Sequence, residues 1–146
     1  MKEKDPLNEA FDRMLVLLFL ADDNTEKLPF EVQTFMYVNS AQGVIDNGGY
    51  RNFFGSDWPN NPTYSKFINA YRTIGCQSQA DDFQKVSLSF PFDNPHLKEK
   101  ERIKYMDDNY DEEGFCIKGW GDSLCGDNEV WEKLERYYKK NIEKFV

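Results

Sequence analysis

The sequence is poor in the residues that carry most metal and nucleophile chemistry. It has a single histidine, His96, and three cysteines, Cys76, Cys116 and Cys125, without any CxxC pair. A structural zinc site needs four nitrogen or sulfur ligands, usually in closely spaced pairs, so we expect none. An odd number of unpaired cysteines also argues against a disulfide framework and fits a reducing compartment. We therefore expect no metal and no other cofactor.

Long apolar stretches are also missing. The one extended run, residues 14–20, has seven residues, whereas a membrane-spanning helix needs about 20. Acidic residues flank this run and no small-residue cleavage site follows it, so a signal peptide is not expected either. We predict a cytoplasmic protein in which the run belongs to a nearly surrounded helix over residues 6–21, with Asp5 as its N-cap.

Positive charge is scarce. The chain has 18 Lys and Arg against 26 Asp and Glu, which gives a formal net charge of −8 and a sequence pI near 4.7. Direct binding to nucleic acid or to an anionic membrane requires a basic face, so we expect neither. A basic protein partner fits this charge.

The common signatures of enzymes are absent. There is no GxSxG, no GxxxxGK[ST] and no HExxH, the motifs of many hydrolases, nucleotide-binding enzymes and metalloproteases. Carboxylate pairs such as Asp81 and Asp82 arise by chance in a chain with 26 acids. We expect no enzyme.

The patterns that are present predict an all-α fold, in a compact single domain over residues 1–146. Aromatic residues make up 16% of the chain, so we expect them to carry much of the packing. Apolar residues at helical spacing predict a bundle of about six or seven helices, with a loop-rich acidic segment before the C-terminal one. The expected ranges are 6–21, 29–45, a short helix from Tyr50, 64–74, 77–88, 98–106 and 128–144.

Residues 46–54, called the corner below, predict a tight turn between two helices. We expect Asn47 and Gly48 to supply the positive φ values that close a helix, and Gly49 to let the chain turn sharply. Tyr50, Phe53 and Phe54 then start a new apolar helical face. The corner is predicted to be structural.

Two residues interrupt the apolar stripe before the corner. Gly43 in mid-helix costs about 1 kcal/mol against Ala, so we expect another helix to pack closely against it. Gln42 needs hydrogen-bond partners if it is buried. A structural polar contact is favoured for it, with ligand binding as the alternative.

Residues 107–127 contain seven acids and one base, Lys118, and so hold −6 of the net charge. A solvated acidic loop is the simplest interpretation. A calcium loop is a second, although the DxDxDG order and its closing Glu are missing. A rigid face of carboxylates spaced like DNA phosphates is a third. The segment is the leading candidate for contact with a basic partner, through Asp107, Asp108, Asp111, Glu112, Glu113, Asp122 and Asp127.

The corner, followed by Ala70, Ile74-Gly75-Cys76 and Ala80, resembles the DNA-mimic protein family of nineteen-kilodalton type, a set of small acidic bacterial helical domains. The likeness covers residues 35–90. Asn52, Gly55 and Cys76 depart from the Gln, Asn and Ala that are usual there. The resemblance implies an all-helical fold and, for its characterised branch, a homodimer that presents DNA-like charge to a DNA-binding regulator.

Three functions follow from these observations. The first is a non-enzymatic acidic protein that occupies the DNA site of a basic DNA-binding protein. The second is an antitoxin or immunity-like inhibitor of a basic toxin. The third is an enzyme or small-ligand binder with a site at the corner, where Asn47, Tyr50, Arg51 and Gln42 would lie together.

Overall fold

The computed structural model describes residues 4–110 and 117–146 of the chain. In these residues the chain forms six α-helices, and its only β-structure is one isolated antiparallel bridge between Tyr110 and Ile117. The expected all-α fold is confirmed. The α-helices are α1 (Pro6–Leu20), α2 (Phe30–Phe54), α3 (Tyr64–Thr73), α4 (Gln77–Ser87), α5 (Glu99–Asp108) and α6 (Asn128–Lys140), and the 3-10 helices are η1 (Thr25–Lys27), η2 (Pro95–Leu97) and η3 (Ile142–Phe145).

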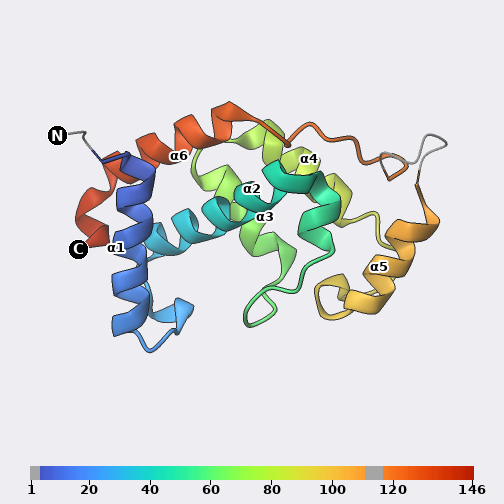
Figure 1. The fold of residues 1–146 in the computed structure, drawn as a ribbon, viewed down its shortest axis with the longest axis horizontal. Coiled ribbons are helices and arrows are strands. Elements are labelled where there is room, and N and C mark those ends of the chain that lie inside the picture. Colours follow the sequence, from blue (N-terminus) through green and yellow to red (C-terminus); the bar gives the residue numbers. More distant parts are fainter. Residues whose placement is uncertain (1–3, 111–116) are drawn as a thin grey trace.

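The long helix α2 runs through the middle of the molecule and contacts α1, α3, α5 and α6 (Figure 1). Helix α6 lies along one side of it and α1 crosses its beginning, while α3 and α4 pack together behind it. The expected C-terminal helix over residues 128–144 instead ends at Lys140, and η3 carries the chain back to α1. Helix α5 lies at the opposite end of the molecule from α1.

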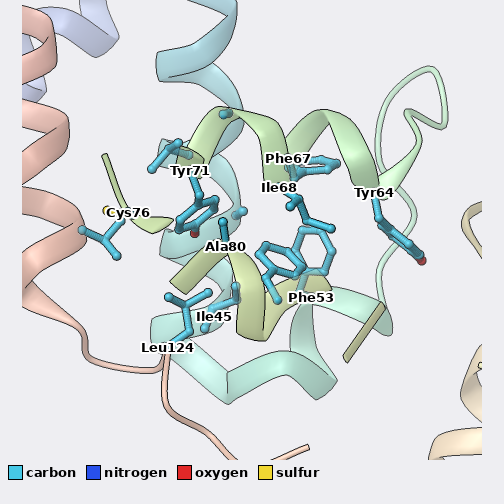
Figure 2. Close-up of a cluster of buried hydrophobic side chains, with 14 of the residues drawn as sticks. Ile45, Phe53, Tyr64, Phe67, Ile68, Tyr71, Cys76, Ala80 and Leu124 are labelled. Carbon is cyan, nitrogen blue, oxygen red and sulfur yellow. The ribbon is translucent and has the colours of Figure 1, made fainter. Parts of the chain in front are cut away.

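An aromatic cluster forms the centre of the core. Phe53 is fully buried, and its ring centroid lies 5.0 Å from those of Trp58 and Phe67 and 4.9 Å from that of Phe83. Figure 2 shows Phe53 of α2 facing residues of α3, with Leu124 from the loop before α6 beside Ile45. Large rings bury much apolar area, and edge-to-face pairs add to that stabilisation. The prediction that aromatic residues carry the packing is consistent with this arrangement.

Helix α1 is not surrounded, and that expectation is wrong. Its N-terminus forms as predicted, because the Asp5 carboxylate accepts a hydrogen bond from the Leu7 backbone N–H at 2.8 Å. Only Ala10 and Met14 are buried, because α6, α2 and η3 pack against one side of the helix. The opposite side exposes five large apolar residues, which are Phe11, Leu15, Val16, Phe19 and Leu20. No helix in the described ranges is long and apolar enough to cross a membrane.

Gly43 also differs from its prediction. It lies in a helical part of α2, and a Cβ built on it meets no atom within 4 Å. Close packing by another helix is therefore not the reason for this glycine, and the structure offers no other reason.

Candidate functional site

The corner is a kink inside α2. Gly49 has φ +70° and ψ −166°, outside the helical region, while Gly48 has φ −174° and is extended there. Among the residues of the corner, Gly49 is the one with a positive φ. The prediction of a positive φ for Asn47 and Gly48 is therefore wrong. Because a left-handed residue with a side chain is strained, the turn occurs at a glycine. A Cβ on Gly49 would lie only 2.5 Å from Oδ1 of Asp122, so the corner and the acidic segment touch.

The aromatic residues of the corner point into the core, as predicted. Tyr50, Phe53 and Phe54 are each 1% exposed or less. The Tyr50 hydroxyl donates a 2.6 Å hydrogen bond to the carboxylate of Asp82, which also accepts one from Ser123. Burial raises the pKa of Tyr50 far above its ordinary value, and the hydrogen bond to Asp82 raises it further. A neutral phenol held in this way is a structural donor rather than a general base.

Gln42 is fully buried and has the partners that the sequence requires. Its Oε1 accepts a hydrogen bond from the Tyr71 hydroxyl at 2.9 Å. Its Nε2 donates to the backbone oxygen of Leu124 at 2.7 Å and to the carboxylate of Asp46 at 2.8 Å. The favoured structural contact is thus what the structure contains, because no solvent-accessible atom of Gln42 is left for a ligand.

Asp46 completes this network on the other side. Its Oδ1 also accepts from the backbone N–H of Gly126, and its Oδ2 from the indole N–H of Trp131, both at 2.8 Å. One carboxylate therefore connects α2 to the loop before α6 and to α6 itself. Hydrogen bonds to a partly buried carboxylate of this kind are charge-assisted and stabilising, so the end of the acidic segment is part of the fold.

The predicted contact residues divide into three groups. Asp107 and Asp108 lie in the last turn of α5 and are exposed, where Asp107 pairs with Arg51 at 3.0 Å and Asp108 with Lys104 at 2.7 Å. Asp122 is exposed beside Gly49, and Asp127 caps α6 through the Glu129 backbone N–H at 3.0 Å. The third group, Asp111, Glu112 and Glu113, lies outside the described residues.

These acids do not gather at one point. Figure 1 shows residues 117–127 running from the α5 end of the molecule back to the start of α6. Asp107 and Asp108, in α5, are thus at one end of the molecule, and Asp127, at the start of α6, is near its middle. Their role in partner binding stays a prediction.

The family is decided by a match that covers most of the chain. The model of the family described as DMP19-like protein matches residues 26–144. The chain belongs to the DMP19-like protein family. This confirms the family resemblance carried by residues 35–90 and extends it through the acidic segment and α6. No curated protein and no solved structure matches the chain.

The DMP19-like corner also has an open side. A cavity of about 420 Å³ lies between the corner and α5, and Asn47, Gly48 and Arg51 line it. Tyr50 and Gln42, which the ligand-site alternative places beside them, do not line it. Arg51 is further engaged by the ring of Tyr110, 4.8 Å from its guanidinium carbon. Within residues 4–110 and 117–146, no group of three potential metal ligands is present, and the calcium-loop alternative falls largely outside these ranges.

Arg102 is an important residue that sequence reasoning missed. It is fully buried in α5 and donates to the backbone oxygens of Phe54 at 2.7 Å and Pro95 at 2.6 Å. It also donates to Asp57 at 2.8 Å, and this hydrogen bond holds the pKa of Asp57 below its ordinary value. The one available signal is its spacing of four from the buried Met106, which puts both on one helix face.

Proposed function

We propose that this DMP19-like protein is a non-enzymatic acidic binding protein that occupies the DNA site of a basic DNA-binding protein in the cytoplasm. The observation that carries the proposal is membership of this family in a chain with net charge −8. A surface rich in carboxylates attracts the lysines and arginines that otherwise neutralise phosphates. Asp107, Asp108 and Asp122 are exposed on the described surface, the first two in ion pairs with Arg51 and Lys104.

Capture from lysate of the native cell, followed by competition with DNA, tests this proposal. The partner should bind in low salt and be released in high salt, because exposed charges are screened beyond about 8 Å at physiological ionic strength. The partner's own DNA should displace this protein. A ternary complex of partner, DNA and this protein would refute DNA mimicry. A captured basic toxin whose activity is blocked would support the antitoxin or immunity alternative instead.

A five-site variant tests the acidic segment. It changes Asp107, Asp108, Asp111, Glu112 and Glu113 to Asn or Gln, and it should fold normally but associate more slowly, with a flatter salt dependence. The matched control removes the same charge elsewhere, at Glu31, Asp93, Glu101, Glu132 and Glu143. Equal association rates for the two variants in surface plasmon resonance would remove the segment from the interface.

The open side of the corner supports a second candidate, a small-ligand site. The 420 Å³ cavity falls within the range of small-molecule pockets. Asn47→Ala and Arg51→Ala would abolish such binding but leave capture of the partner unchanged. Capture that depends on these two side chains would instead make the cavity part of the protein interface.

We further propose that the protein is a homodimer formed through the exposed side of α1. Phe11, Leu15 and Phe19 repeat every four residues along the helix, with Val16 and Leu20 beside them. A contiguous apolar face of this kind marks an interaction surface. A second copy is the proposed occupant because this side is mostly apolar and its one exposed acid, Asp12, is already paired with Lys4, so it offers little to a highly charged basic partner. Sedimentation should show a dimer that Leu15→Glu with Phe19→Glu converts to a monomer; a monomeric wild type would contradict the proposal.

A further inference from the structure

A cavity of about 820 Å³ lies between α1, α2 and the loop before α3. Its two rim loops, residues 22–26 and 58–62, both lie at the lower edge of Figure 1. Its volume is in the range of cavities that hold a ligand. Neither the corner nor the acidic segment at residues 107–127 contributes to it.

Aromatic rings form one wall of this cavity. The Phe67 ring lies 5.0 Å from that of Tyr37 and 5.2 Å from that of Trp58. Among residues 4–110 and 117–146 the buried indole N–H of Trp58 has no hydrogen-bond partner, and its ring packs against Phe53 and Phe67. Aromatic faces carry negative electrostatic potential and attract cations placed over them. Because Phe67 is almost fully buried, the half-buried rings of Tyr37 and Trp58 are the part of the wall that a flat cationic group can contact.

Carboxylates surround the mouth of the cavity. Asp22, Asp23 and Glu26 are exposed, and in the described part of the chain none of the three forms an ion pair. Among the described lining residues Lys66 is the one base. Burial raises the pKa of Tyr37 and the charge of Glu26 raises it further, so the negative potential of the rim reaches the aromatic wall.

We propose that this cavity receives an arginine side chain of a basic protein partner, an inference that rests on the function proposed above. A guanidinium group is planar, stacks on aromatic faces and offers paired N–H donors to carboxylates. The three carboxylates and the ring wall supply both kinds of contact within one cavity. Lysine, a compact and strongly hydrated charge, gains less from such a wall.

Titration of the full-length protein with Nα-acetyl-argininamide tests the cavity directly. In ¹H–¹⁵N spectra, the shifted amides should be confined to residues 22–26, 36–40 and 58–67. The citrulline analogue has the same shape without the charge and should bind at least about tenfold more weakly. Equal binding of the two probes, or shifts spread over the whole acidic surface, would overturn the proposal.

Matched variants separate the cavity from overall charge. Asp22 and Asp23 have φ +53° and +60°, a region that Asn tolerates as well, so D22N/D23N/E26Q should keep the fold and weaken binding about tenfold. The control D93N/E101Q/E132Q removes three charges away from the cavity and should bind as the wild type does. Lys66→Gln should strengthen binding. An unchanged affinity in D22N/D23N/E26Q would also overturn the proposal.

The same variants distinguish failure of this inference from failure of the proposed function. If D22N/D23N/E26Q competes with DNA for the captured partner as well as the wild type does, the cavity is not used and DNA mimicry stands. If argininamide binds in the cavity but DNA never displaces the protein from its partner, the arginine site stands and DNA mimicry fails.

Discussion

The kinked part of α2 and helix α1 are both rich in apolar residues, yet they end in opposite environments. Tyr50, Phe53 and Phe54 are almost completely buried, while Phe19 is 78% exposed and Leu20 71% exposed. The kink lets α2 contact elements on several sides, whereas α1 contacts its neighbours along one side only. The apolar content of a helix thus indicates that some of its side chains will be buried. How many of them are buried depends on how many other elements pack around the helix.

The two regions also differ in their polar contacts. Around the kink, the side chains of Gln42, Asp46 and Tyr50 make hydrogen bonds that join distant segments. In α1, the Arg13 to Glu9 ion pair lies within one helix on a partly exposed surface, and one hydrogen bond, from the Tyr138 hydroxyl to Glu9 at 3.1 Å, joins these side chains to a distant segment. Buried polar networks specify one arrangement of the chain, whereas surface pairs contribute little. The following variants test whether stability is concentrated on the α2 side.

The largest effect is expected for Arg102→Met. The guanidinium holds the end of α2 through the Phe54 carbonyl and is fully buried. Its loss leaves backbone carbonyl acceptors unpaired, at a cost of about 1–3 kcal/mol for each one that is buried. Arg13→Met in α1 is the control and should cost no more than about 1 kcal/mol. Denaturation curves measure both, and equal costs would show that stability is not concentrated near the kink.

Two glycines in the same helix should respond with opposite sign. Gly49→Ala forces a side chain into φ +70° and toward Asp122, at a cost of about 1–3 kcal/mol. Gly43→Ala meets open space in a helical conformation and should stabilise by about 0.5–1 kcal/mol. Melting temperatures of the two variants decide this. A Gly49→Ala variant as stable as the wild type would mean that the kink tolerates a side chain at position 49.

Alkaline pH should destabilise the buried core around α2. Burial raises the pKa of Tyr64 to about 12 and that of Cys76 to about 11, and raises that of Tyr71. Their unfolded values are 10.0 for Tyr and 9.0 for Cys, so the unfolded state loses protons first as pH rises. The contribution of these groups is complete below about pH 9 and is lost as pH rises through their folded pKa values. Helix α1 contains no Tyr or Cys.

Absorbance at 295 nm, which reports tyrosinate, checks this expectation alongside circular dichroism. The exposed tyrosines should ionise gradually, and the buried ones should ionise together with the loss of helical signal. Gradual ionisation of all the tyrosines with the helical signal intact would contradict the burial of Tyr50, Tyr64 and Tyr71.

The smallest effect on stability is expected on the open side of α1. Leu15→Ala with Phe19→Ala should change the free energy of unfolding by no more than about 0.5 kcal/mol for each substitution, because both side chains are exposed, Leu15 to 45% and Phe19 to 78%. The measurement is made at a dilution where sedimentation shows monomer only, so that dimer dissociation does not contribute. Met14→Ala on the buried side should cost about 2–5 kcal/mol. Similar losses on both sides would mean that α1 is surrounded after all.

Local patterns predicted much of this fold. Three predictions depend only on neighbours within a few residues or on the burial of one side chain. They are Asp5 as the N-cap, the buried triad Tyr50, Phe53 and Phe54, and the need for hydrogen-bond partners around Gln42. Exposure of α1 and burial of Arg102 depend on which distant elements pack nearby, which spacing along one helix does not encode. Gly49 rather than Gly48 takes the positive φ because the residue that turns is chosen by contacts such as that with Asp122.

The candidate site was less predictable than the fold. The sequence identified the acidic segment by its charge, but Asp127 turns out to cap α6 and Asp107 to pair with Arg51. In the sequence, Asp22 and Asp23 appear only as acidic residues that flank the apolar run, because the aromatic rings beside them come from residues 37, 58 and 67. The charge of a segment can be read from the sequence, but which side chains lie next to those charges depends on how the chain folds.

The hydrogen bonds of Asp46 have a consequence for the order of events during synthesis. Its partners Gly126 and Trp131 follow it by 80 and 85 residues, a separation that takes on the order of ten seconds to translate at typical rates. Until then α2, α3 and α4 can pair locally, while the Asp46 carboxylate remains in water. The nascent chain therefore spends that interval without these hydrogen bonds to its central helix, and they form only after residues 124–131 have been synthesised.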